Sequence, residues 1–278
     1  MMLVRALKPK TLAAWTVVLL CYRTWVGYYH SSSSSESFGG QQESNTNTFK
    51  QLQFSHGTLY DRYPPQFACT SRAVRSAIAR MQDKNNNNYK ATTTTTTFTK
   101  ILSFGSSTGR EAKTLADKYF NHTNEIIFGV DLDEQTLAEA RAFTKDLPPG
   151  KVVFFHGATT PISAYAPYDA IFADAVLCYH NGRIRYTPTE YRDTIFPYTD
   201  FLHALSELDK VLKVGGILQL VNTNYDFRQT EMVKRYREIS CDCTAQFFVP
   251  VVDIEKMEFI PTNVGNGIPC IWEKMEDS

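Results

Sequence analysis

The segment of residues 101–116, ILSFGSSTGREAKTLA, places a glycine-bounded loop between a short apolar run and an amphipathic one. The run before the loop is partly β-branched, which predicts a buried strand of a parallel sheet. After Gly109, apolar residues recur at helical spacing with charged residues between them, so a helix is expected there. A strand, a tight loop and a helix in this order are typical of α/β folds whose loop binds a nucleotide-like ligand at the helix N-terminus.

The same loop, GSSTG at 105–109, also fits the pattern G-x-S-x-G of the hydrolase nucleophile elbow, in which Ser107 would attack the substrate. In that fold the catalytic histidine follows the nucleophile and the acid along the chain. Here the last histidine is His203, within a helical pattern that precedes the last expected parallel strand. We therefore favour the ligand-binding loop over the serine hydrolase.

Strand-like and helix-like segments alternate through the rest of the chain. Further strands are expected at 125–130, 151–155, 168–173 and 217–221, and helices at 133–144 and 201–212. The helix at 201–212 is expected to end at the Gly215-Gly216 pair. Two apolar runs, 245–252 and 268–272, close the chain as an antiparallel pair. The pattern predicts a Rossmann-like α/β fold: a mostly parallel sheet with helices on both faces and a C-terminal antiparallel β-hairpin.

An aspartate ends the second of these strands, 22 positions after Gly109. This residue, Asp131, is expected to face the loop and to accept hydrogen bonds from both hydroxyls of a ribose. Asp133 is available to cap the following helix, so Asp131 is expected to have no other partner in the fold.

Four segments, in order over residues 99–222, resemble the motifs of class I S-adenosylmethionine-dependent methyltransferases. They are ILSFGSSTGREAKTLA, GVDLDEQTLAEAR at 129–141, YDAIFADAVL at 168–177 and LDKVLKVGGILQLVN at 208–222. The resemblance implies S-adenosylmethionine as cofactor and methyl transfer to a small-molecule or protein acceptor. It implies that the glycine loop lies along the methionine part, that Asp131 holds the ribose and that Leu132 packs on the adenine. The cofactor-binding residues are thus expected to be Gly105, Ser106, Ser107, Gly109, Asp131, Leu132 and Asp174.

Three positions depart from the family pattern. Ser107 stands where the loop usually has its middle glycine, and Ser103 replaces an acidic residue near the end of the first strand. The segment His156-Gly157-Ala158 lacks the acid often found beside the adenine. A non-catalytic protein that binds the cofactor or a partner therefore remains an alternative, and an NAD(P)-dependent oxidoreductase is a weaker one because the loop is not G-x-G-x-x-G.

The catalytic residues are not fixed by any motif. Asp174 and His180, in the polar turn after the fourth strand, are the candidates, with strand-end capping and a surface position as the structural alternatives. Further residues could line the same cleft or form a lid, or could simply cap loops and pack: Cys178, Tyr179, Asn222, Asn224, Tyr225, Tyr60, Arg62 and Tyr63.

Before the domain, the chain begins with a basic and then apolar segment that is typical of a signal peptide or signal anchor at residues 1–30. The apolar run is compatible with membrane anchoring through residues 11–29, so the expected location is the secretory pathway or a membrane, with the cytoplasm as the alternative. Residues 31–50 are polar and repetitive, and predict a disordered linker. The methyltransferase-like domain is expected at 51–278, with a low-complexity loop insertion at 85–97.

Charge and cysteine usage exclude little. With 29 basic and 29 acidic residues the 278-residue chain has no net charge, so no field favours nucleic acid as a partner. The six cysteines show neither the framework of a small disulfide-rich domain nor the spacing of a zinc site, and no metal is expected. Asn121-His122-Thr123 is a glycosylation sequon, which matters only if the domain is lumenal.

Overall fold

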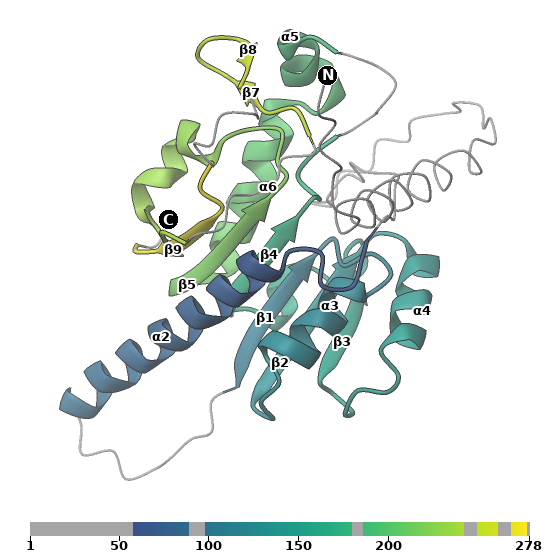
Figure 1. Cartoon of the computed structure of the whole chain (residues 1–278), viewed down its shortest axis with the longest axis vertical. Coiled ribbons are helices and arrows are strands. Elements are labelled where there is room, and N and C mark those ends of the chain that lie inside the picture. Colours follow the sequence, from purple (N-terminus) through teal and green to yellow (C-terminus); the bar gives the residue numbers. More distant parts are fainter. Residues whose placement is uncertain (1–57, 89–97, 180–185, 242–248, 261–267, 277–278) are drawn as a thin grey trace, which may run out of the picture. The chain divides into compact units, whose positions relative to one another are not determined.

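A computed structural model describes residues 58–88, 98–179, 186–241, 249–260 and 268–276. Seven strands form one sheet in the order β3-β2-β1-β4-β5-β9-β6, and β7 and β8 form a separate two-stranded sheet. The strands from β3 to β5 are parallel, whereas β9 is antiparallel to both β5 and β6. This arrangement, visible in Figure 1, confirms the predicted Rossmann-like, mostly parallel sheet with an antiparallel C-terminal part.

The strands are β1 (Thr99–Phe104), β2 (Glu125–Asp131), β3 (Val152–His156), β4 (Tyr168–Asp174), β5 (Leu212–Val221), β6 (Tyr236–Glu238), β7 (Val252–Asp253), β8 (Glu258–Phe259) and β9 (Ile271–Lys274). The α-helices are α2 (Pro64–Asn88), α3 (Arg110–Thr114), α4 (Glu134–Phe143), α5 (Pro188–Glu190) and α6 (Tyr198–Val211). The described residues also form short π and 3-10 helices: η1 (Leu115–Tyr119), η2 (Ile162–Tyr165), η3 (Tyr191–Ile195), η4 (Phe227–Gln229) and η5 (Glu231–Arg235).

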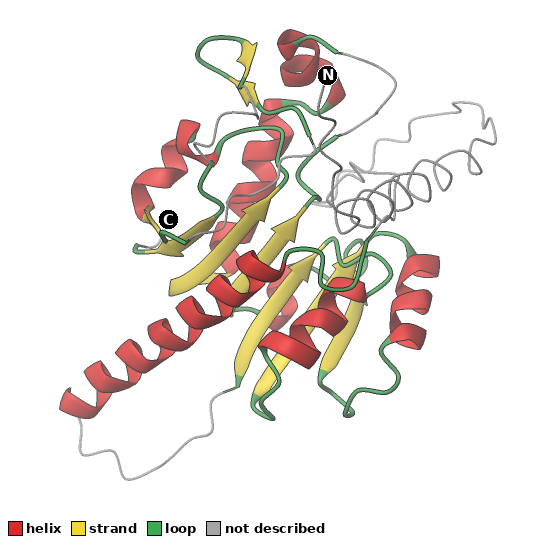
Figure 2. Ribbon diagram, in the orientation of Figure 1, coloured by secondary structure: helices red, strands yellow, loops and turns green. Residues whose placement is uncertain are grey.

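Helices cover both faces of the sheet because side chains of successive strand residues alternate between two apolar clusters. On β1, Leu102 belongs to the cluster that includes Phe201 and Leu205 of α6. Its neighbour Ile101 belongs to the other cluster, which includes Phe67 of α2. Figure 2 shows α2 and α3 in front of the strands and α6 behind them.

The chain reverses its direction of travel across the sheet at β1, which lies between β2 and β4. Open α/β sheets bind their ligands at such a point, outside the carboxyl ends of the strands. The loop after β1 and the carboxyl ends of β2 and β4 therefore define the edge where the candidate site lies.

Two boundaries differ from the sequence-based expectation. Helix α2 continues through residues 85–88, which we expected in a loop insertion. An asparagine costs only about 0.7 kcal/mol relative to alanine in a helix and so does not end one by itself. The expected glycine end of α6 is also wrong, since α6 ends at Val211 and Gly215, with φ 78°, lies within β5.

The closing strands also differ in their partners. The expected pair of 245–252 with 268–272 does not form among the described residues, because β9 pairs instead with the three-residue strand β6. At the end of the first run, Val252 is buried and its N–H donates to the carbonyl of Asn224, so the segment is held by the loop after β5. A strand as short as β6 gives no periodic signal, which is why the sequence did not indicate it.

Several expectations lie outside the described residues. They concern the segments 1–30 and 31–50, the membrane-anchoring run 11–29, residues 89–97 of the expected insertion and His180. Within the part of the chain that is described, none of the helices has the length and apolar character needed to cross a bilayer.

One disulfide connects Cys69 of α2 to Cys241, which follows β6, with a Cα–Cα distance of 6.4 Å. The two residues are 172 positions apart, so sequence spacing gave no indication of the pair. The other described cysteines, Cys178 and Cys270, are buried.

Candidate functional site

The loop after β1 turns tightly because both of its glycines adopt positive φ, 73° at Gly105 and 77° at Gly109. A side chain at Gly105 would place its Cβ 2.4 Å from Cγ2 of Val176, and one at Gly109 would lie 2.8 Å from Cβ of Ala140. Both positions therefore require glycine for conformation and for space. Ser107, in place of the middle glycine, also adopts a positive φ of 49°, a conformation that costs a residue with a Cβ of the order of 1–2 kcal/mol.

Asp131 holds this loop from the end of β2. Its Oδ2 accepts a hydrogen bond from the backbone N–H of Ser107 at 2.9 Å. Its Oδ1 accepts from the N–H groups of Leu132, at 2.8 Å, and Asp133, at 3.2 Å. The expectation that Asp131 has no other partner in the fold is therefore wrong. The carboxylate is partly exposed and keeps one acceptor position of its four for a ligand.

Asp133 caps α4 as predicted, since its side chain accepts a hydrogen bond from the N–H of Thr136. The two aspartates thus have different roles: Asp133 stabilises the N-terminus of α4, and Asp131 positions the glycine loop.

The ends of β2 and β3 meet beside Leu132. The Nε2 atom of His156 lies 2.8 Å from the carbonyl oxygen of Leu132. The N–H of Gly157 donates to the carbonyl of Asp131, and a Cβ at Gly157 would lie 3.1 Å from Leu132 Cδ2. The two segments that the resemblance assigns to the adenine are therefore adjacent in space.

A buried chain of hydrogen bonds reaches the end of β4 from α2. Thr70 Oγ1 donates to Gln219 Oε1 at 2.6 Å, and Gln219 Nε2 donates to Asp174 Oδ2 at 2.7 Å. Only 8% of Asp174 is exposed, and its second oxygen, Oδ1, makes no hydrogen bond within the described residues. Burial raises the pKa of this carboxyl well above its ordinary value, and the nearby Glu111 adds to the effect.

Glu111, in the first turn of α3, is an acidic residue that the sequence did not single out. Its Oε1 accepts a hydrogen bond from Ser103 Oγ at 2.8 Å, so the carboxyl group lies beside the strand position where the family usually has its acid. Burial raises the pKa of Glu111 to about 7, against the lowering effects of the Ser103 hydrogen bond and of Arg62. Its signal in the sequence is weak, because an acid in a first helical turn is ordinarily explained by the helix dipole.

A protonated carboxyl group is neutral, and a cation placed beside it favours loss of the proton. Glu111 and Asp174 interact electrostatically, and Arg62 lowers the pKa of both. The end of β4 and the first turn of α3 thus hold two carboxyl groups with raised pKa values and one buried acceptor oxygen, which fits a ligand that carries positive charge.

The segment before α2 packs over this edge of the sheet. Asn222, after β5, donates to the hydroxyl of the buried Tyr63 at 2.7 Å. The guanidinium of Arg62 lies 5.1 Å from the centre of the Tyr63 ring. The structure thus supports a packing role for Tyr63 over a role in a lid, and the hydrogen bond from Asn222 holds its hydroxyl in place.

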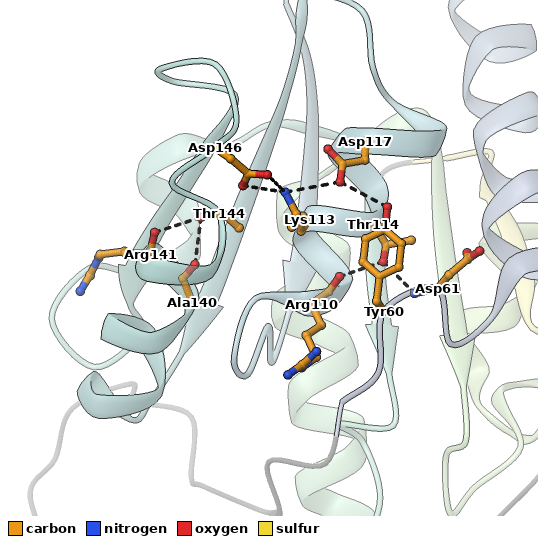
Figure 3. A network of polar contacts seen from close by, with 10 residues as sticks. All are labelled: Tyr60, Asp61, Arg110, Lys113, Thr114, Asp117, Ala140, Arg141, Thr144 and Asp146. Carbon is orange, nitrogen blue, oxygen red and sulfur yellow. Dashed lines mark hydrogen bonds and ion pairs between the residues drawn. The ribbon is translucent and has the colours of Figure 1, made fainter. Parts of the chain in front are cut away.

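The residues just before Arg62 in the same segment, Tyr60 and Asp61, form hydrogen bonds with α3 and η1 (Figure 3). The N–H of Asp61 donates to Thr114 Oγ1 at 2.8 Å, and the Tyr60 hydroxyl donates to Asp117 at 3.2 Å. The Asp61 carboxylate accepts from the Tyr119 hydroxyl at 2.8 Å and pairs with Lys118. These bonds hold the segment against the helices that follow the glycine loop.

Two other residues expected near the cleft are structural. Asn224 is fully buried, accepts from the N–H of Tyr179 and donates to the carbonyl of Pro250 at 2.8 Å. Tyr225 is also fully buried, and its hydroxyl donates to the carbonyl of Phe196. Both side chains hold the loop after β5 in place, so the structure supports the alternative that these two residues stabilise a loop. Cys178 is buried too, and burial raises the pKa of its thiol to about 12, which disfavours a reactive thiolate.

Residues 102–220 match the family model of a methyltransferase domain. This range begins in β1 and ends in β5, so it contains the loop, Asp131, Asp174 and Glu111. No curated protein matches the chain.

Similar solved structures include an rRNA methylase, described as putative, from Clostridium thermocellum, with 16% identity, coverage of 66% of this chain and 90% of that one, and a TM-score of 0.40. PKMT2 from Rickettsia typhi in complex with AdoHcy has 15% identity, coverage of 56% and 25%, and a TM-score of 0.36. Phosphoethanolamine N-methyltransferase 2 from Haemonchus contortus, in complex with S-adenosyl-L-methionine, has 20% identity, coverage of 46% and 25%, and a TM-score of 0.30. The chain spans about a quarter of the length of the last two.

Proposed function

We propose that residues 102–220, which match the family model of a methyltransferase domain, form a class I S-adenosylmethionine-dependent domain, and that this chain transfers a methyl group from its cofactor to a small-molecule or protein acceptor. The observation that carries the proposal is the hydrogen bond between Ser107 and Asp131, which joins the glycine loop to the acidic end of β2. The match to a methyltransferase model argues against the oxidoreductase and serine hydrolase alternatives.

We assign S-adenosylmethionine as the cofactor of this domain and propose its contacts residue by residue. Asp131 accepts from the ribose, and Leu132 packs on the adenine beside Gly157. The loop residues Gly105, Ser106, Ser107 and Gly109 lie along the methionine part. Ser106 Oγ is buried and makes no hydrogen bond within the described residues, so it is available to such a ligand.

Asp174 and Glu111 are assigned to the positively charged part of the cofactor. S-adenosylmethionine supplies an electrophilic methyl group on a sulfonium ion, and it also carries an ammonium group. Asp174 Oδ1 is a buried carboxylate acceptor without a hydrogen bond among the described residues, and Glu111 supplies the carboxyl group that is absent at Ser103. The chain's contribution to methyl transfer is then mainly positioning, since aligned reactants gain a large effective molarity.

The acceptor is expected beyond the carboxyl end of β4, where residues 175–179 lead toward His180. A general base is needed only when the acceptor loses its proton early, and His180 is our candidate for that role. The family does not specify the acceptor, because loops outside the cofactor site determine it.

The decisive test is binding of S-adenosylhomocysteine to the purified protein. A ligand at one hundred times its Kd stabilises the folded state by about 2.7 kcal/mol, so thermal unfolding should move to higher temperature. A folded protein that shows no shift at millimolar ligand would refute the proposal. Incubation with radiolabelled S-adenosylmethionine and a cell extract then shows whether the label enters the small-molecule or the protein fraction, and binding without any labelled product would favour the non-catalytic alternative.

A further inference from the structure

We propose that Asn121 is the acceptor of an N-linked glycan, added in the oxidising lumen of the secretory pathway, a modification that lies beyond the methyl transfer proposed above. The tripeptide Asn121-His122-Thr123 is the only N-x-S/T sequence in the 278 residues. The side-chain amide that receives a glycan must be accessible to the transferase, and the residues from Asn121 to Asn124 are all exposed.

The turn that carries the sequon holds its backbone in place while leaving the acceptor amide available. The His122 N–H donates to Glu125 Oε2 at 2.8 Å, and the His122 carbonyl accepts from Lys151 Nζ at 2.6 Å. Neither the Asn121 nor the Thr123 side chain makes a hydrogen bond to any residue that the structure describes. A glycan on this amide would therefore break no contact of the described fold.

The position of the turn is also compatible with the function. It connects η1 to the amino end of β2, whereas the glycine loop and Asp131 lie at the carboxyl ends of the parallel strands. These are opposite edges of the sheet, so a glycan at Asn121 points away from the cofactor site.

The Cys69–Cys241 disulfide gives independent support for an oxidising compartment. Its Cα–Cα distance of 6.4 Å lies within the range that a disulfide spans, and stable disulfides are rare in cytosolic proteins. The other described cysteines are buried, so the described surface presents no free thiol. The basic and apolar segment at residues 1–30 is the kind of sequence that directs a chain to such a compartment.

The modification step is a glycosyl transfer. The side-chain amide nitrogen of Asn121 forms a bond to the anomeric carbon of a lipid-linked oligosaccharide, the bond from that carbon to the lipid diphosphate breaks, and one amide proton leaves with the diphosphate. In the same compartment the two thiols transfer two electrons and two protons to a protein disulfide, which is reduced to a dithiol.

The test is expression of the full chain, with its own N-terminal segment, in a eukaryotic cell. Treatment with peptide N-glycosidase F should give one discrete increase in electrophoretic mobility and should convert Asn121 to aspartate in peptide mass spectra. Asn121→Gln and Thr123→Ala should abolish the shift, whereas Thr123→Ser, which keeps the sequon, should retain it. Alkylation before lysis should leave Cys69 and Cys241 unlabelled until a reductant is added.

The proposal fails if the wild-type chain is folded and shows no shift, or if the shift persists in Asn121→Gln. It also fails if Cys69 and Cys241 are alkylated without reductant, because the chain would then reside in a reducing compartment. Binding of S-adenosylhomocysteine is unaffected by either outcome, so this test is separate from that of the methyltransferase.

Discussion

The backbone N–H of Ser107 donates to the carboxylate of Asp131 across 2.9 Å, so the residue expected to hold a ribose also holds the loop in front of it. Two further N–H groups, from Leu132 and Asp133, share the same carboxylate. The geometry of the loop and the proposed binding of the ribose therefore depend on the same side chain.

The first prediction is that Asp131→Ala lowers both stability and cofactor affinity. Three backbone donors lose their acceptor, which costs about 1–3 kcal/mol of unfolding free energy if one of them stays unsatisfied. Loss of a charge-assisted bond to the ribose, worth about 1.5–3 kcal/mol, lowers the affinity for S-adenosylhomocysteine at least about tenfold. Urea unfolding and calorimetric titration measure the two effects.

Asp133→Ala is the matched control, since it removes the cap of α4 and leaves Asp131 in place. It should cost about 1 kcal/mol of stability with near-normal binding. Wild-type binding by Asp131→Ala together with weak binding by Asp133→Ala would show that the ribose is misplaced.

A second prediction concerns the strained position in the loop. A residue with a Cβ at this positive φ costs the folded state about 1–2 kcal/mol, and Ser107→Gly removes that cost. Glycine also gives the unfolded chain more conformational entropy, which reduces the gain in unfolding free energy by about 0.5–1 kcal/mol. The net gain in stability should be no more than about 1 kcal/mol by urea unfolding, whereas the β-branched Ser107→Val should destabilise the protein.

Ser107→Ala serves as the control for chemistry. It keeps the backbone strain and removes only the hydroxyl, so binding of S-adenosylhomocysteine should stay close to that of the wild type. A fluorophosphonate should label neither protein. Covalent labelling of Ser107 in the wild type would reinstate the hydrolase interpretation.

The sequence predicted most of the sheet and the positions of Asp131, Leu132 and Asp133, because each depends on local periodicity and on where a strand ends. It did not predict the partner of Asp131, since Ser107 lies 24 residues away and is brought to it only by the pairing of β1 with β2. Glu111 was missed for another reason: an acid in a first helical turn is ordinarily explained by the helix dipole, and its contact with Ser103 depends on the geometry of the turn between strand and helix. Local patterns thus place elements, and contacts across the sheet decide which polar groups act together.

A third prediction concerns the pH dependence of stability. The pKa of Glu111 is about 7 in the folded protein and near 4.5 in the unfolded chain, so the folded state binds more protons between these values. Stability should therefore fall as pH rises from about 4.5 to about 7, and the raised pKa of Asp174 acts in the same direction. Glu111→Gln should flatten this slope in urea unfolding series. An unchanged slope would mean that Glu111 does not titrate in this range.

A fourth prediction follows from the same carboxyl groups. If they receive the positive charge of S-adenosylmethionine, binding below pH 7 should release a proton, because the cation favours the ionised form. Titration calorimetry in buffers of different ionisation enthalpy measures this release. S-adenosylhomocysteine, which lacks the sulfonium charge, should release less, and Glu111→Gln should release less with either ligand. If both ligands release the same number of protons from the wild type and from Glu111→Gln, the two carboxyl groups take no part in cofactor binding.

The last prediction concerns the link between α2 and the site. Thr70 follows the disulfide-bonded Cys69 and donates to Gln219, which in turn donates to Asp174. Thr70→Val keeps the shape of the side chain and removes the donor, so the buried Gln219 oxygen loses its partner at a cost of about 1–3 kcal/mol. Gln219 is then free to turn away from Asp174, and affinity for S-adenosylhomocysteine should fall as well. Ser71→Ala, which removes a hydrogen bond to Ala68 within the same helix, is the control and should leave affinity unchanged.

Reduction of the Cys69–Cys241 disulfide removes the covalent link between α2 and the segment after β6, and should lower the unfolding free energy by about 2–5 kcal/mol. If Thr70→Val loses stability and keeps wild-type affinity, the chain of hydrogen bonds supports the fold alone and Asp174 is positioned by β4 without it.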